Sequence, residues 1–208
     1  MLTCVSPASN FDSPHRDDHL EEVGRQVPAG APGPFGILEV KQKQLNIIYG
    51  TSKETSDFVV DAFELWWSKR QGVYQHIKRL QIDLDNGPEI KSHRTQFIKR
   101  IVEFSDKTGL EIELVYYPPY HSKYNSVEHC WGVLEKHWNG TLLSDRETLL
   151  RWSESMRWDG VMPNVWLHDQ EYFRHVRLTK KELRPYENRL ERASIIGDWS
   201  IKVKPEKN

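Results

Sequence analysis

Two carboxylate residues, Asp85 and Glu128, stand where the chain could form a metal site. Asp85 ends the alternating apolar run at 80–84, and the Asn-Gly-Pro that follows at 86–88 is typical of the end of a strand. The pattern therefore places this carboxylate at the tip of a strand, pointing into solvent or into a cleft. Glu128 stands at the start of a helical pattern and so lies at the end of a second element.

A helix that begins after Asn125 would present Glu128 in its first turn. Asn125 is a suitable N-cap with an acid three residues later, and the apolar residues that follow recur at helical spacing: Val127, Trp131, Leu134 and Trp138. Each acid also has a structural interpretation that stays open. An Asp before Asn-Gly commonly forms a turn, and a first-turn Glu commonly caps a helix and favours its dipole.

Several motifs around the two acids occur together in one order and spacing. They are DNGPE at 85–89, HRTQF at 93–97, YPPYHSKYN at 117–125 leading to Glu128, and WGVLE at 131–135. With these motifs the chain, from about Pro34 to its C-terminal region, resembles the catalytic domain of bacterial DDE transposases, close to the ISAzo family within the wider Tc/mariner-like supergroup. The resemblance implies that Asp85 is the second acid and Glu128 the third acid of a catalytic triad. One departure is Ser126, where the family commonly has proline.

The activity that the resemblance implies is metal-dependent cleavage and strand transfer of insertion-sequence ends. Its cofactor would be Mg²⁺ or Mn²⁺ in a two-metal site, incomplete here, with Asp85 and Glu128 as ligands. Two ions roughly 3.5–4 Å apart can stabilise the attacking and leaving oxygens of an in-line displacement at phosphorus. Such hard ions prefer oxygen ligands, so carboxylates suit them and thiols do not.

The fold that the resemblance implies is a mixed α/β, ribonuclease H-like sheet flanked by helices. In this fold the first acid lies on the first strand, which precedes a hairpin and pairs beside the strand of the second acid. The hairpin is recognisable at 35–40 and 45–49, so the first strand should precede Pro34. Residues 1–33 are rich in Pro, Gly, Ser, Asp and His and read as an irregular or disordered lead-in. We therefore expect the first strand to be missing, and with it the first acid, since Asp12, Asp17 and Asp18 follow no alternating run.

The expected organisation is the lead-in, a DDE catalytic core at 34–140 and a helical C-terminal extension at 141–208. No pattern of paired helices for end recognition precedes Pro34. The hypothesis is then an N-terminally truncated or frame-disrupted transposase whose catalysis is impaired. Two alternatives stay open: a non-catalytic DNA-binding or oligomerising remnant, and an active metal-dependent nuclease that recruits an N-terminal acid.

DNA, as transposon ends and as target, is the partner that the resemblance implies; homo-oligomer formation stays open and no membrane partner is expected. Four residues in the loop before Glu128 offer stacking and phosphate-binding groups: Tyr120, His121, Lys123 and Tyr124. Arg94 could contact a DNA backbone, although a charged face exposed to solvent is the more common role of such residues. The net charge of −1 argues weakly against general nucleic-acid binding, yet residues 1–64 hold five Lys and Arg against ten Asp and Glu, whereas residues 176–208 hold nine against five.

Further helices and a strand are expected around these motifs. Capping boxes at 51–54, 144–147 and 179–182 predict helices, the first running to about residue 68. Periodicity predicts a helix at 93–107, closed by Gly109, and a strand at 111–117.

Two cysteines allow no disulfide framework or four-thiolate zinc site, and His129 and His137 are too far apart on one helix to share an ion. No apolar run spans a bilayer and no signal pattern opens the chain, so a cytoplasmic location is expected.

Overall fold

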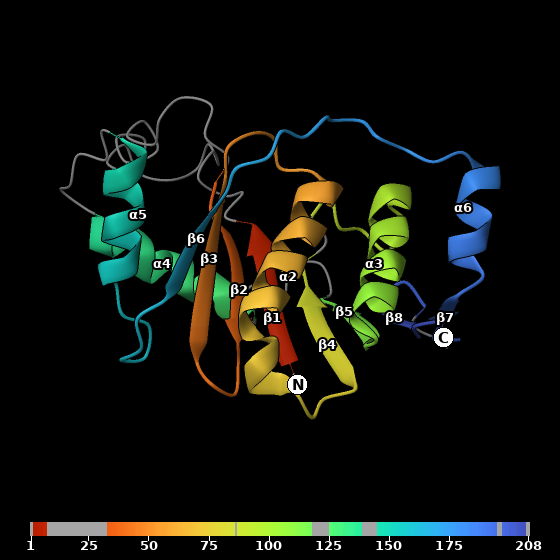
Figure 1. Ribbon diagram of the computed structural model, residues 1–208, viewed down its shortest axis with the longest axis horizontal. Helices are drawn as coiled ribbons and strands as arrows, with labels where there is room; N and C mark the ends of the chain where they lie inside the picture. The colour runs from red at the N-terminus through yellow and green to blue at the C-terminus, as the bar shows by residue number, and fades with distance from the viewer. Residues whose placement is uncertain are drawn as a thin grey trace.

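The computed structural model describes residues 2–7, 33–85, 87–117, 125–138, 145–194 and 197–206. Within these residues, eight strands form one mixed sheet in the order β6-β3-β2-β1-β4-β5-β8-β7 (Figure 1). In chain order the strands are β1 (Leu2–Pro7), β2 (Phe35–Glu39), β3 (Gln44–Gly50), β4 (Arg79–Leu84), β5 (Glu111–Tyr116), β6 (Asn164–His168), β7 (Leu190–Arg192) and β8 (Ser200–Val203). β1, β4 and β5 run parallel, and β2 runs antiparallel to both β1 and β3.

Helices cover both faces of this sheet. They are α2 (Ser56–Arg70), the short 3₁₀ helix η2 (Gln71–Tyr74), α3 (Thr95–Thr108), α4 (Ser126–Trp138), α5 (Arg146–Ser155) and α6 (Lys180–Glu187). α2 and α3 lie in front of the sheet in Figure 1 and α4 lies behind it. Two apolar clusters fill the two layers: one joins the sheet to α2 and α3, and the other joins β2 and β3 to α4 and α5. No helix in the part of the chain that the structure describes is both long and apolar enough to cross a bilayer.

The expectation that the first strand is missing is wrong. β1 stands in the centre of the sheet, where Val5 pairs with Ile37 of β2 on one side and with Leu84 of β4 on the other. Its six residues contain no Asp or Glu, so a strand is present but carries no acid. Asp12, Asp17 and Asp18 lie outside the described residues.

The C-terminal part is not purely helical as expected. Besides α5 and α6 it contributes β6, which pairs with β3 at one edge, and β7 and β8, which extend the sheet beyond β5. These short strands lacked a long alternating pattern, and they are held by pairing with strands far away in the sequence. The region after residue 141 thus adds strands at both sides of the sheet.

Helix ends follow local capping chemistry, with two shifts from the expected residues. Thr55, rather than Thr51, caps α2 by accepting from the Phe58 amide. Asp145, rather than Ser144, caps α5. The other signals are confirmed: Gly109 ends α3 in the left-handed conformation, and Thr179 forms a reciprocal capping box with Glu182 at the start of α6.

A buried carboxylate joins the hairpin to α2. Glu39, at the end of β2, is fully buried and accepts hydrogen bonds from both Arg70 Nε and Arg70 Nη2 at 2.8 Å and from Trp66 Nε1 at 2.9 Å. Asn46 Nδ2 donates to it at 3.1 Å, and the Tyr74 hydroxyl donates to its second oxygen. The carboxylate is therefore fully satisfied, as a buried charge must be.

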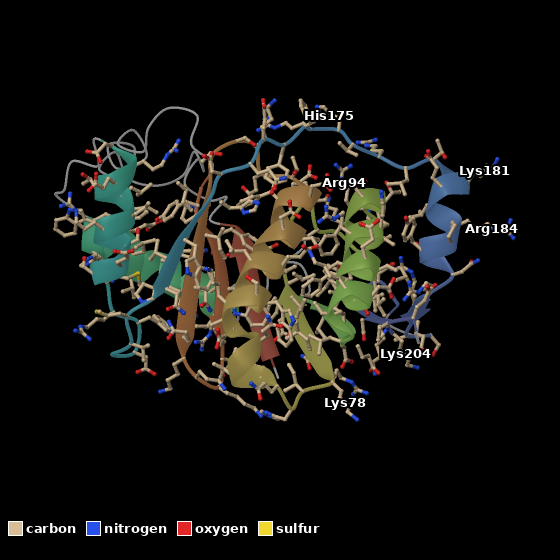
Figure 2. The ribbon with its side chains drawn as sticks, in the orientation of Figure 1. Lys78, Arg94, His175, Lys181, Arg184 and Lys204 are labelled. Carbon is tan, nitrogen blue, oxygen red and sulfur yellow. The ribbon has the colours of Figure 1, made fainter. Side chains whose placement is uncertain are left out.

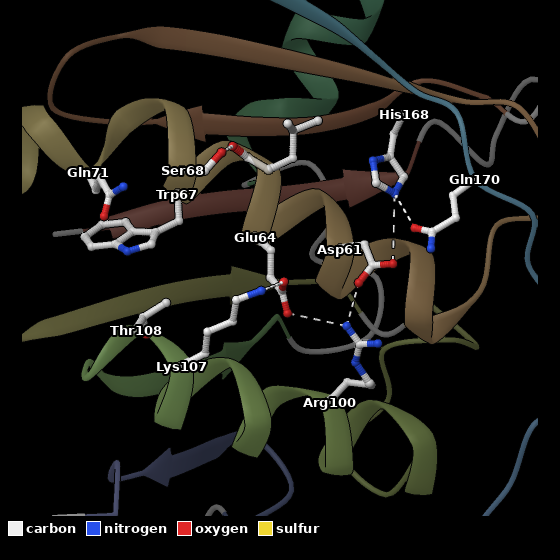
Figure 3. A pocket seen from close by; sticks show the side chains of 11 residues that line it. Asp61, Glu64, Trp67, Ser68, Gln71, Arg100, Lys107, Thr108, His168 and Gln170 are labelled. Carbon is white, nitrogen blue, oxygen red and sulfur yellow. Dashed lines mark hydrogen bonds and ion pairs between the residues drawn. The ribbon is translucent and has the colours of Figure 1, made fainter. Parts of the chain in front are cut away.

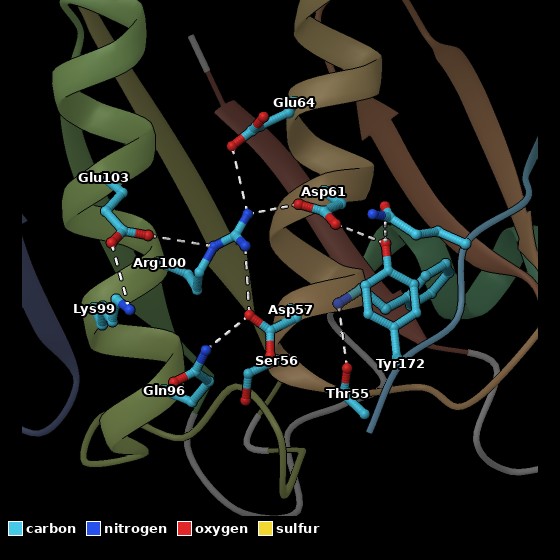
Figure 4. A network of polar contacts seen from close by, with 12 residues as sticks. Thr55, Ser56, Asp57, Asp61, Glu64, Gln96, Lys99, Arg100, Glu103 and Tyr172 are labelled. Carbon is cyan, nitrogen blue, oxygen red and sulfur yellow. Dashed lines mark hydrogen bonds and ion pairs between the residues drawn. The ribbon is translucent and has the colours of Figure 1, made fainter. Parts of the chain in front are cut away.

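A second charged network joins α2 to α3 (Figure 4). Arg100 of α3 lies 2.5 Å from Asp61, 3.4 Å from Asp57 and 3.5 Å from Glu64, all on one face of α2. Its side chain is only 20% exposed. Arg100 therefore faces the neighbouring helix and is not part of a solvated basic face.

Candidate active site

Asp85 follows directly after β4, as the sequence pattern predicted. Its Oδ1 accepts a hydrogen bond of 3.0 Å from the Gly87 amide, and the Ile90 amide donates to the Gly87 carbonyl at 3.1 Å. These bonds form an Asx turn followed by a backbone turn, so the turn-forming role of Asp85 is real. Only one carboxylate oxygen takes part in the bond to Gly87, and the turn sets the direction of the side chain.

Glu128 lies in the first turn of α4, also as predicted. Asn125 caps the helix, with its Oδ1 accepting from the Val127 amide at 3.3 Å. The helix rests on β2 at Gly36, where an added Cβ would lie 2.5 Å from a Trp131 ring carbon and 3.0 Å from a Val127 methyl carbon. Glycine at position 36 thus permits the close approach of the helix that carries Glu128.

Strand register brings the two acids to the same end of the sheet. Leu84, just before Asp85, pairs with Val5, and the next residue of β1, Ser6, pairs with Gly36 beneath the first turn of α4. Neighbouring strands are about 4.8 Å apart, so β4 and β2 stand roughly 10 Å apart across β1. Asp85 and the first turn of α4, which contains Glu128, therefore lie at the same end of the sheet.

The loop after Asp85 is fastened to three neighbouring elements. Ser56 Oγ of α2 donates to the Glu89 carbonyl at 2.7 Å, and the Ser56 amide donates to the Glu89 carboxylate at 3.3 Å. The Tyr116 hydroxyl of β5 donates to the Ile90 carbonyl at 2.9 Å, and Arg192 of β7 donates to the Ser92 carbonyl at 2.9 Å. Such anchoring holds the backbone around Asp85 in one arrangement.

Arg94 is bound within this loop. Its Nη2 lies 2.9 Å from Glu89 Oε2 and its side chain is 14% exposed. The guanidinium thus stabilises the loop, and its contact with DNA stays a prediction. Tyr120, His121, Lys123 and Tyr124 lie outside the described residues.

Two acids near Asp85 were not singled out from the sequence. Asp83 lies in β4, two residues before Asp85, and is 9% exposed on the sheet face opposite Leu84. Glu54 precedes α2, and burial raises its pKa to about 7, with the negative charges of Asp85 and Glu89 acting in the same direction. Alternation along β4 could have indicated Asp83, whereas Glu54 becomes a neighbour of Asp85 only through the fold.

Replacing Glu54 with glutamine should stabilise the protein at alkaline pH. The folded pKa of Glu54 lies above its ordinary value of 4.5, so wild type loses stability as pH rises from 4.5 through about 7. We expect Glu54→Gln to raise the free energy of unfolding at pH 8 by about 1–3 kcal/mol. Urea unfolding across a pH series would measure this. A gain that is as large at pH 4 as at pH 8 would contradict the assignment.

The side chains at this end of the sheet suit a hard divalent cation by type. Asp85 and Glu128 carry oxygen donors, and the negative charges of Asp85 and Glu89 add to burial in raising the pKa of Glu54, so a cation here would lower that pKa. Within the described ranges, however, no group of three or more His, Cys, Asp or Glu residues could hold one ion together. The residues present thus fit a metal in kind, with fewer described ligands than a complete site needs.

A cavity among the described residues lies elsewhere. It has a volume of about 700 Å³ and opens between α2, α3 and the chain after β6 (Figure 3). Its polar lining is dominated by paired charges, with Arg100 and Lys107 bound to the carboxylates of α2. Neither Asp85 nor Glu128 lines it. The cavity is therefore separate from the two acids at the end of the sheet.

Comparison with protein-family models gave a match over most of the chain. Residues 13–205 match the family model described as the Rhodopirellula transposase DDE domain. No curated protein and no solved structure gave a match. The match spans nearly the whole chain, including β2 to β8 and both motifs that carry Asp85 and Glu128. The chain therefore belongs to the Rhodopirellula transposase DDE domain family.

Proposed function

We propose that this chain is a transposase catalytic domain built for metal-dependent cleavage and strand transfer of insertion-sequence ends, and that its catalysis is impaired. The observation that carries the proposal is the register across β1, which sets Asp85 and the first turn of α4 at one end of the sheet. Family membership supports DNA transposition as the process that this site serves.

The order of the central strands supports a ribonuclease H-like fold. β3, β2, β1, β4 and β5 are neighbours in that order, with β2 antiparallel and with α2 and α3 as connections. This is the arrangement in which the first strand precedes a hairpin and pairs beside the strand of the second acid. β1 occupies the place of the strand that would carry the first acid.

Asp85 and Glu128 are the residues that would hold Mg²⁺ or Mn²⁺. The ions would supply charge stabilisation to the attacking and leaving oxygens during displacement at phosphorus. Asp85 would be oriented for this task by its bond from Gly87, and Glu128 by the packing of α4 on Gly36. Because β1 carries no acid, this assignment supplies two of the three carboxylates of a triad, and we infer weaker metal binding and slower cleavage than a complete triad would give.

Mn²⁺ binding and Mn²⁺-dependent nicking of supercoiled DNA test this proposal together. Both should be weak in wild type and should disappear in Asp85→Asn and in Glu128→Gln. The matched controls are Asp159→Asn and Glu154→Gln, which change exposed acids outside the candidate site. Nicking that survives either site substitution would refute the assignment of these acids.

The acid-free β1 favours a second candidate function, a non-catalytic DNA-binding or oligomerising protein. In that case the chain would bind DNA or an intact relative without any Mn²⁺-dependent reaction. Dose-dependent inhibition of an intact transposase, with no nicking by the chain itself, is the result expected from this alternative.

A further inference from the structure

The chain between β6 and α6, together with the start of α6, carries an excess of exposed positive charge. Residues 173–184 hold five of the 29 Lys and Arg residues of the chain but only one of its 30 Asp and Glu residues. We refer to residues 172–184 as the basic strap. All five cations are exposed, namely Arg174, Arg177, Lys180, Lys181 and Arg184. Phe173, which precedes them in the strap, is an aromatic residue that is 69% exposed.

These cations have no structural role of the kind that other basic residues have here. Within the described part of the chain, none of the five forms an ion pair, whereas Arg70, Arg100 and Arg189 each bind a carboxylate. The single acid of the strap, Glu182, is used to cap α6. Figure 2 shows Lys181 and Arg184 extending outward from α6. Their charge is thus available to an external anion.

The strap is held firmly to the body of the protein. At one end the Tyr172 amide donates to Ser52 Oγ at 2.8 Å and the Tyr172 hydroxyl donates to Asp61 at 2.7 Å. Further along, the Leu178 amide donates to Thr95 Oγ1 at 3.0 Å, directly before the capping box of α6. Between these anchors His175 adopts a positive φ of 66°, which turns the chain. The cations are therefore presented on a fixed backbone.

The strap crosses the molecule at the end where Asp85 lies. Its anchors are Ser52, which follows β3, and Thr95, which begins α3 next to Arg94. Figure 1 shows it passing over the N-terminal ends of α2 and α3. The segment 172–178 spans at most about 20 Å, and the eight residues of α6 add about 12 Å. A duplex exposes one phosphate per strand for about every 3.4 Å, so the strap matches the length of several phosphates.

We propose that the basic strap binds the phosphate backbone of duplex DNA beside the Asp85 end of the sheet. Unpaired Lys and Arg side chains on a fixed backbone supply the counterion-releasing contacts on which such binding depends. Outside the strap the chain holds more Asp and Glu than Lys and Arg. A polyanion is therefore attracted to the face of the protein that carries the strap. The inference rests on the proposed function in taking DNA as the substrate.

Binding of a fluorescein-labelled duplex, followed by anisotropy in EDTA over a series of KCl concentrations, tests the strap alone. The double variant Arg174→Ala/Arg177→Ala should bind roughly tenfold more weakly than wild type, and its salt slope should fall by about two. The matched control is Lys41→Ala/Lys78→Ala, which removes two exposed cations from the opposite end of the sheet. Circular dichroism and thermal melting would show that both variants are folded.

The inference is overturned if the control weakens binding as much as the strap variant, if the strap variant binds like wild type, or if wild type binds anionic lipid vesicles and no duplex. Because EDTA removes divalent ions, the result is separate from the metal chemistry. Unchanged binding by the strap variant together with nicking that depends on Asp85 and Glu128 would refute the strap and leave the proposed function standing. Loss of DNA binding in the strap variant, together with no metal-dependent nicking by wild type, would support the strap and refute the proposed function.

Discussion

Glu39→Gln is expected to lower the free energy of unfolding at pH 7 by about 3–5 kcal/mol, because one partner of a buried charge pair is removed. The carboxylate is fully buried and accepts from Arg70, Trp66, Asn46 and Tyr74. A glutamine of the same shape would turn an NH₂ group toward these donors and would leave the guanidinium of Arg70 without its counter-charge. Urea unfolding followed by tryptophan fluorescence would measure the loss.

The loss should depend on pH in a defined direction. Burial acts to raise the pKa of Glu39, but hydrogen bonds from Arg70, Tyr74 and Trp66 outweigh it and hold the pKa below its ordinary 4.5. Stability from this carboxylate is therefore present above pH 4.5 and is lost as pH falls through the folded pKa. The difference in the free energy of unfolding between wild type and Glu39→Gln should become smaller below pH 4.5. Glu171→Gln, which changes an exposed residue, is the control and should differ little from wild type at any pH. A difference that becomes larger in acid would contradict this account.

Arg100→Met is expected to destabilise the protein by about 2–4 kcal/mol at low ionic strength, since it leaves the partly buried carboxylates of Asp57 and Asp61 without their cation. Glu64, in contrast, keeps its ion pair with Lys107. Asp57, Asp61 and Glu64 lie on one face of α2 and are 17–23% exposed, so their charges repel one another strongly once Arg100 is gone. The methionine keeps most of the side-chain volume, which separates the charge effect from a packing defect. Thermal and urea unfolding would measure the loss.

Added salt and a neighbouring lysine provide the controls for Arg100. Salt screens repulsion between the three carboxylates, so part of the loss should be recovered at about 1 M NaCl, where the screening length is about 3 Å. Lys99→Met on the same helix breaks only a half-exposed pair with Glu103 at 3.7 Å and should cost less than about 1 kcal/mol. Equal losses for the two variants would show that Arg100 has no special role.

Local patterns predicted those elements whose stability is decided locally. The helix at 95–108 has apolar residues at helical spacing and a closing glycine, and those apolar residues are buried: Phe97, Ile98, Ile101, Val102 and Phe104. The hairpin, the helix after Asn125 and the positions of Asp85 and Glu128 at element ends follow the same logic. In each case a capping, turn or periodic signal lies within a few residues of the feature.

The features that were missed depend on partners distant in the sequence. β1 is a short apolar run before a polar segment, and only pairing with β2 and β4 makes it a strand. Burial of Glu39 depends on Arg70 and Tyr74, which follow more than thirty residues later. Burial raises the pKa of Glu54, and the charges of Asp85 and Glu89, again about thirty residues away, add to this effect. No local sequence pattern indicates these contacts.

The central position of β1 has a consequence for the order of folding. Its parallel partner β4 lies far along the chain, with Leu2 paired to Gln81. Non-local parallel pairings close large loops and form slowly. Until β1 is inserted, the sheet is two separate halves, β6-β3-β2 on one side and β4-β5-β8-β7 on the other. Before that insertion, the edges of β2 and β4 would have unpaired backbone groups that can bind a strand of another molecule. The chain is therefore most prone to intermolecular strand pairing and aggregation during this interval.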